Sequence, residues 1–239
     1  MSAGITTVTT VGAGTLQAST SAATVAASPH ANTRPYDLVV MVCYTDQDAT
    51  IVNDAGDGWV ILDSGYNSGS TFGIFLAVCL AASNGASGYA GLTLPGTGAY
   101  TAQTYSYRLA NSMTQFDLAV RGQSAGWYNA TASATTGSGP AILQPYAQCI
   151  DLIGRGYNNG GTTTTSGNIT GFTESFDTGQ TSPAHGVVLN YRLLTGAVQN
   201  PLVSGTLAVA KTNRAGVRGM VGLVGNTQSR RTMQNRRMF

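Results

Sequence analysis

Residues 72–76 read Phe-Gly-Ile-Phe-Leu, and residues 185–189, which lie 113 positions further along the chain, read His-Gly-Val-Val-Leu. Both stretches are short and apolar and are flanked by turn residues, a pattern that indicates β-strands. Two other landmarks recur at the same offset: Gly58-Trp59 matches Gly171-Phe172, and segment 105–109 falls on segment 218–222. The sequence therefore predicts an internal repeat of two similar β half-units.

Further β-rich runs, bounded by Gly, Asn, Asp and Ser, continue along the chain, whereas no window shows several turns of helical apolar spacing. The expected strands span 36–44, 59–63, 73–81, 101–109, 117–121, 149–153, 172–176, 186–194, 202–210 and 217–224. Such a series predicts an all-β fold, an antiparallel β-sandwich of jelly-roll-like type. Because a half-unit of about 90 residues buries little apolar surface alone, we expect the two half-units to share one core.

Composition changes divide the chain into four parts. Residues 1–35 are rich in Thr, Ala and Ser and predict an extended N-terminal arm with at most one strand. The first half-unit is expected over 36–128 and the second over 129–228, followed by a basic tail over 229–239.

Charge is scarce and unevenly distributed. Only 9% of the 239 residues are charged, against about 25% in an ordinary soluble domain, but 42% are hydrophobic, enough to favour folding over disorder. Residues 1–177 hold 4 Arg and all 10 acids, whereas residues 178–239 hold 8 basic residues and no acid. The basic end predicts contact with an acidic protein neighbour, favoured here over nucleic acid, and a merely solvated tail stays an alternative. The candidate docking residues are Arg230, Arg231, Arg236, Arg237 and Phe239.

Several classes of protein are disfavoured. No stretch approaches 18 uninterrupted apolar residues, so no membrane-spanning helix is expected, and the first residues lack the features of a secretory signal. Cys43, Cys79 and Cys149 are widely spaced in apolar runs, which predicts buried thiols rather than disulfides or a zinc site.

No metal or cofactor site is predicted. The acidic group in segment 46–57 lacks the spacing of a calcium-binding loop and its closing glutamate, so a solvated loop is favoured over a calcium site. The Gly-rich stretches lack the lysine of a phosphate-binding loop.

One motif raises the question of catalysis. Gly122-Gln123-Ser124-Ala125-Gly126 fits G-x-S-x-G, but a hydrolase needs this serine at a strand-to-helix turn, and WYNATASATTGSG, which follows, does not predict a helix. We therefore predict no catalytic residue and no enzyme. Exposed aromatic side chains would instead suit a carbohydrate-binding module, with Trp59 and Trp127 as the leading stacking candidates and with Tyr66, Tyr89 and Tyr157 beside them.

Short motifs spread over most of residues 36–239 resemble those of β-rich virion proteins of tailed phages. They are Asp37-Leu38-Val39-Val40, Gly58-Trp59-Val60, the apolar strand 74–80, Val120-Arg121-Gly122, Gly171-Phe172-Thr173, strand 217–224 and the final RRTMQNRRMF. In this combination the chain particularly resembles minor tail and appendage proteins of phages that infect actinobacteria. The resemblance implies a structural role in a virion.

The resulting hypothesis is a non-enzymatic virion component, made in the host cytoplasm without a membrane association. It would assemble with other virion proteins, and with copies of itself, through the N-terminal arm and the Arg-rich C-terminus. Two alternatives stay open: a capsid decoration or minor capsid protein, and a module that binds a host cell-surface glycan.

Overall fold

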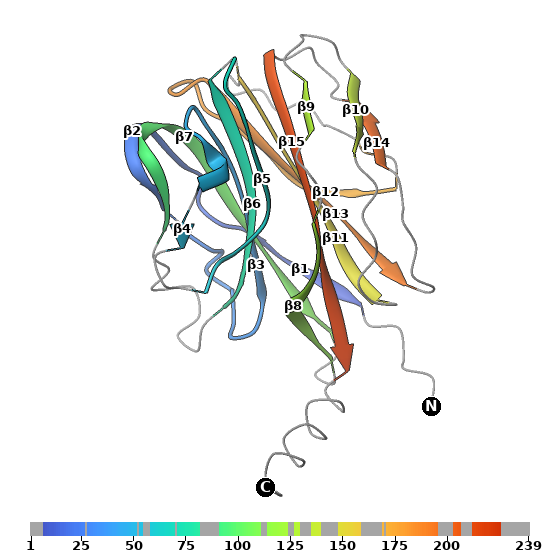
Figure 1. Ribbon diagram of the computed structural model, residues 1–239. Coiled ribbons are helices and arrows are strands. Elements are labelled where there is room, and N and C mark those ends of the chain that lie inside the picture. The colour runs from blue at the N-terminus through green and yellow to red at the C-terminus, as the bar shows by residue number, and fades with distance from the viewer. Residues whose placement is uncertain are drawn as a thin grey trace, which may run out of the picture.

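The computed structural model describes residues 7–26, 28–51, 53–54, 58–69, 71–81, 91–110, 114–123, 127–129, 135–139, 148–158, 169, 171–195, 203–206 and 212–225. Over these residues the chain forms strands and one short 3-10 turn, η1 (Ala49–Ile51), with no α-helix. Two antiparallel sheets pack face to face (Figure 1). This confirms the predicted all-β sandwich. In the part of the chain that is described, no helix is long and apolar enough to span a membrane.

The first sheet is built from the N-terminal half of the chain. Its seven strands are β1 (Val8–Ala13), β2 (Gln17–Val25), β3 (Leu38–Thr45), β4 (Asn53–Asp54), β5 (Val60–Asn67), β6 (Phe72–Leu80) and β7 (Leu92–Leu109). The main order is β1-β7-β3-β6-β5, and β2 and β4 also pair with the long β7.

The second sheet is built from the C-terminal half. Its six strands are β8 (Thr114–Gln123), β9 (Trp127–Asn129), β11 (Gln148–Asn158), β12 (Thr173–Gly179), β13 (His185–Thr195) and β15 (Thr212–Gly225). They are ordered β12-β13-β11-β15-β8, with β9 also on β15. A separate pair, β10 (Thr135–Gly139) and β14 (Val203–Thr206), lies outside this sheet.

The two sheets repeat one topology. In each, a hairpin (β5-β6 or β12-β13) lies beside a strand from earlier in the sequence (β3 or β11). The next strand across the sheet is the last of the unit (β7 or β15), and the final one again comes from earlier in the chain (β1 or β8). β5 and β12 begin 113 residues apart, at Val60 and Thr173, and so do β6 and β13. A bulge also recurs at this offset, between Ile61 and Asp63 in β5 and between Glu174 and Phe176 in β12. The repeat seen in the sequence is therefore a repeat of strand order and register.

The boundaries of the units differ from those expected. Each of the ten expected strands overlaps an observed one, but segment 8–25, expected as an arm with at most one strand, forms both β1 and β2 along β7. β8, expected in the first half-unit, pairs with β15 in the second sheet. The N-terminal segment is thus an integral edge of the first sheet, because β7 is long enough to pair with β1 and β2 in succession.

The core lies between the two central strands, β3 and β11. An added Cβ at Gly156 would lie 2.4 Å from Cδ2 of Tyr44, and one at Gly154 would lie 3.1 Å from both γ carbons of Val42. The second sheet therefore has glycines at the points where it faces large side chains of the first sheet. The apolar residues around this contact form the main buried cluster.

A second apolar cluster covers the outer face of the first sheet. Met41 and Cys43 of β3 and Phe75 of β6 point into it, and Val25 of β2 and Leu92 of β7 close it from outside. Trp59 belongs to the same cluster and is only 5% exposed. β2 and the first half of β7 therefore act as a cover over this sheet (Figure 1).

The contact between β3 and β11 is tested by Gly156→Ala. The new methyl group cannot fit beside Tyr44 without movement of the ring or the strand, so we expect a loss of about 1–3 kcal/mol of unfolding free energy, measured by urea denaturation. Gly69→Ala is the control, because an added Cβ there would lie 3.4 Å from its nearest neighbour, Oδ1 of Asn67. We expect its unfolding free energy to change by no more than about 0.5 kcal/mol. Equal stability of the two variants would contradict this packing.

Candidate functional site

Charged side chains gather on the outer face of the second sheet, where they pair with one another. The carboxylate of Asp151 on β11 accepts bonds from Nε and Nη2 of Arg218 on β15, at 2.9 and 2.7 Å. Nε of Arg192 on β13 donates to the same carboxylate at 2.8 Å. Asp151 and Arg218 are fully buried, so three strands are joined by an ion network that must stay intact.

Two further buried pairs lie on the same face. Nη2 of Arg155 donates to Oδ1 of Asn190 at 2.8 Å, and the hydroxyl of Tyr157 donates to Oδ1 of Asp177 at 2.9 Å. Burial lowers the pKa of Arg155 to about 10 and raises that of Tyr157. Arg155 therefore remains a cation at neutral pH, held by its neighbours.

The equivalent face of the first sheet is apolar. Cys43 lies opposite Phe75 on β6, whereas Arg155 lies opposite Val188, which is 113 residues after Phe75. Cys43 and Arg155 thus occupy matching positions in the two sheets. The repeated halves keep their inner faces apolar and differ on their outer faces.

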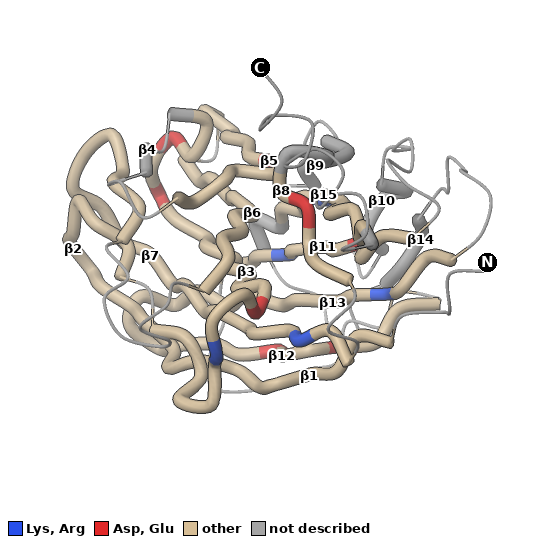
Figure 2. The backbone as a smooth tube through the Cα atoms, turned by 90° about the horizontal axis from the view of Figure 1, so that it is seen from below, with Lys and Arg blue, Asp and Glu red and all other residues tan. Residues whose placement is uncertain are grey.

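Because these charged side chains are buried, they add little charge to the surface, and few of the described residues are charged at all (Figure 2). Arg34 is the one fully exposed charged side chain among those whose burial the structure describes. The half-buried charged side chains are those of Asp46, Asp48, Arg108, Asp117, Glu174 and Arg192. The surface is therefore formed mainly by hydroxyl, amide and small apolar groups.

Several candidate residues are placed away from solvent. Trp59 is buried in the outer cluster of the first sheet, so its ring cannot serve as an exposed stacking platform, and Tyr157 is 2% exposed. This corrects the expectation for both, because their rings are needed to fill interior space. The backbone of Trp127 pairs with Gly216, but its side chain lies outside the described residues, as does Tyr89.

The cysteines are free and buried, as expected: Cys43, Cys79 and Cys149. Burial raises the pKa of Cys43, and it raises that of Cys149 to about 12. Both thiols therefore stay protonated at neutral pH and are poor nucleophiles.

Other candidates lie outside the described residues. These are Ser124 and the docking residues Arg230, Arg231, Arg236, Arg237 and Phe239. Of the acidic loop, Asp48 accepts bonds from the backbone and hydroxyl of Thr50. Among the described residues no group of three or more His, Cys, Asp or Glu could hold a metal ion.

One end of the sandwich collects both terminal segments. Val8 at the start of β1 pairs with Leu109 at the end of β7, and Gly225 at the end of β15 pairs with Thr114 at the start of β8. Leu109 and Thr114 line one pocket, so these two pairs are neighbours. We call this the docking end; the basic segment that follows Gly225 begins there.

The docking end displays a tight turn, Arg34-Pro35-Tyr36-Asp37. The N–H of Asp37 donates to the carbonyl of Arg34 at 3.1 Å, and Tyr36 has a φ of +69°. Proline at the second position and a positive φ at the third are the features of a type II β-turn, whose third position normally requires Gly or Asn. Tyr36 nevertheless occupies it and is 78% exposed.

The turn is held from two sides. The carboxylate of Asp37 accepts bonds from Nε and Nη2 of Arg108 on β7, at 2.9 and 2.7 Å, and from the N–H of Arg34 at 2.7 Å. The hydrogen bond with Asp37 raises the pKa of Arg108. Ala81, just after β6, accepts from the N–H of Tyr36 and donates to the carbonyl of Asp37. The unfavourable backbone at Tyr36 is thus fixed by its surroundings.

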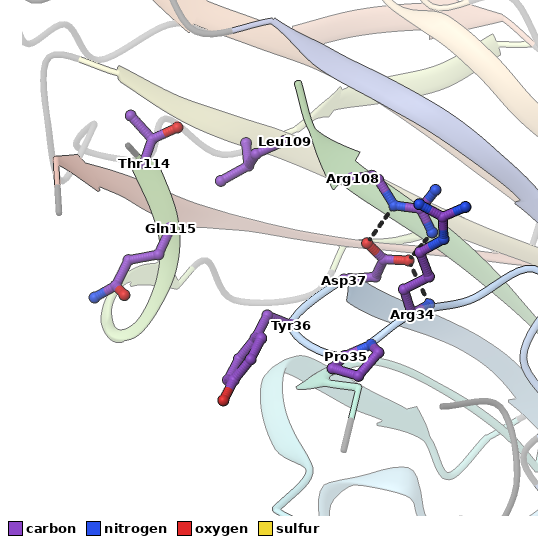
Figure 3. A pocket seen from close by; sticks show the side chains of 8 residues that line it. All are labelled: Arg34, Pro35, Tyr36, Asp37, Arg108, Leu109, Thr114 and Gln115. Carbon is purple, nitrogen blue, oxygen red and sulfur yellow. Dashed lines mark hydrogen bonds and ion pairs between the residues drawn. The ribbon is translucent and has the colours of Figure 1, made fainter. Parts of the chain in front are cut away.

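Beside this turn lies a shallow pocket of about 240 Å³. It is lined by Arg34, Pro35, Tyr36, Asp37, Arg108, Leu109, Thr114 and Gln115 (Figure 3). The ring of Tyr36 points away from the Asp37–Arg108 ion pair toward open space. Both halves of the chain contribute, since Leu109 ends β7 and Thr114 begins β8.

Sequence reasoning did not single out Tyr36 or the Asp37–Arg108 pair. The available signal was the Pro in Arg34-Pro35-Tyr36-Asp37, which favours a turn. Comparison of the chain with protein families, with curated proteins and with solved structures gave no match.

The buried His185 gives the fold a defined pH dependence. Its ring packs edge-on against Tyr44, with ring centroids 4.9 Å apart, and burial lowers its pKa from 6.5 to about 4. As the pH falls below 6.5 the unfolded chain takes up this proton before the folded one, so the stability that is present above pH 6.5 is lost toward pH 4. We expect a loss of about 2 kcal/mol between pH 7 and 5 from this residue, measured by urea denaturation.

The control for this titration is His185→Phe, which keeps a ring against Tyr44 but cannot be protonated. Its unfolding free energy should fall less than that of the natural protein between the same two pH values. Identical pH dependence in the two proteins would show that His185 does not carry the effect.

Proposed function

We propose that the protein is a non-enzymatic structural component of a phage virion, a minor tail or appendage protein that attaches through its docking end. The observation that carries this proposal is the scarcity of exposed charge, because all but one of the charged side chains whose burial is described are buried or half-buried. Acidic residues and lysine are depleted at the centres of protein interfaces, whereas an ordinary soluble domain contains about 25% charged residues. A surface on which Arg34 is the one exposed charge among the described side chains suits burial against other subunits.

The positions of the terminal segments support the same function. The segments before Thr7 and after Gly225 both begin at the docking end. They can therefore bind one neighbour together, so that the free energies of the two contacts combine. The four arginines of the tail, Arg230, Arg231, Arg236 and Arg237, give this end a positive charge that would attract an acidic neighbour.

This function is tested by deletion of residues 229–239. Because the tail lies beyond β15, we expect the truncated chain to keep its circular dichroism spectrum and melting temperature. Its copy number in purified particles, measured by quantitative mass spectrometry, should fall by about tenfold or more, since charge-assisted bonds contribute about 1.5–3 kcal/mol each.

Two matched variants separate charge from sequence in the tail. Replacement of the four arginines by Gln should act like the deletion, whereas replacement by Lys should retain part of the incorporation. Normal incorporation of the truncated chain would contradict docking through the tail, and absence of the natural protein from particles would contradict a virion role. A copy number near that of the major capsid protein would instead favour capsid decoration.

A further inference from the structure

The Arg34-Pro35-Tyr36-Asp37 turn holds an aromatic residue where the backbone favours glycine. A side chain at positive φ costs free energy that glycine avoids, and the exposed ring of Tyr36 gains little packing in return. Residues kept in such conformations tend to mark functional sites. The fold therefore stabilises a turn that exposes the ring of Tyr36 to solvent.

The turn also has the composition of an interface anchor. Tyr and Arg are among the residues most enriched where binding free energy concentrates. Tyr36 is the one large exposed hydrophobic side chain in the described part of the chain, and Arg34, two residues away, is its one exposed charge. Because Asp37, Arg108 and Ala81 already fix the backbone, little conformational entropy remains to be lost on binding.

From this geometry we infer that the turn is the rigid anchor of the docking end and binds an acidic segment of a neighbouring protein. An apolar side chain of that segment packs on Tyr36, and a carboxylate pairs with Arg34 at the rim of the pocket. The inference rests on the proposed attachment through the docking end and adds the residues and the chemistry of the partner.

Charge disfavours two other occupants. The chain's own tail is basic and would be repelled by Arg34. A second copy offers only half-buried carboxylates among the acidic side chains that are described, on Asp46, Asp48, Asp117 and Glu174. Nucleic acid is also disfavoured at the turn itself, since its binding depends on several phosphate contacts at once, whereas Arg34 is the one fully exposed cation beside Tyr36.

The test uses Tyr36→Gly in the full-length chain and the copy number in purified particles. Glycine adopts a positive φ without steric cost, so we expect the melting temperature to stay the same or rise. Incorporation should fall about tenfold, the effect of losing an anchor residue. Tyr36→Phe, which keeps the ring, should be incorporated almost normally, and Thr20→Ala, an exposed change on β2, should have no effect.

Charge is tested separately by Arg34→Gln and Arg34→Lys, of which only the first should reduce incorporation strongly. A photo-crosslinking amino acid at position 36 then identifies the partner, and we expect crosslinks to an acidic segment of another virion protein. Crosslinks to a second copy of this chain, to nucleic acid or to a basic segment would overturn the inference.

The outcomes distinguish the two proposals. If the natural protein is incorporated and Tyr36→Gly is incorporated equally well, the anchor is wrong while the virion role stands. If the natural protein is absent from particles, the virion role fails and the anchor fails with it.

Discussion

The close approach of β3 and β11 is the constraint on which the rest of the structure depends. Val42 and Tyr44 of one sheet need the space that Gly154 and Gly156 leave on the other. Another such contact lies toward the edge of the sandwich, where an added Cβ on Gly219 would lie 2.6 Å from Cβ of Leu62. The first sheet supplies the large side chains and the second supplies the glycines, so two halves of the same topology fit together only in this relative position.

Because the inner faces are committed to this packing, the repeated halves differ on their outer faces. The first sheet covers its outer face with β2 and the beginning of β7, which makes a second apolar core. The second sheet places Asp151, Arg155 and Arg218 there and buries them. Many of the described charged side chains of this chain thus form buried pairs, and few charges remain on its surface. The docking end is the exception, since Arg34 is exposed there and the arginines of the tail follow.

The sequence predicts the strands well where apolar side chains are dense, as in segments 72–76 and 185–189. It allows at most one strand where β1 and β2 form, because their Thr, Ser and Ala residues show no apolar alternation and their pairing partner, β7, lies far along the chain. Burial of charge is hidden for the same reason: Asp151 and Arg218 are 67 residues apart. Residue type alone also does not predict which aromatic side chains are exposed, since Trp59 is buried while Tyr36 is exposed.

Hydrogen exchange, followed by mass spectrometry on the free chain and on the chain within purified particles, tests most directly whether the docking end is the attachment surface. Attachment through the docking end predicts slower exchange in the particle at residues 34–37 and 109–115, and unchanged exchange in the β5–β6 turn and in segment 180–184 at the opposite end of the sandwich. Protection of those two turns, without protection of the docking end, would contradict it.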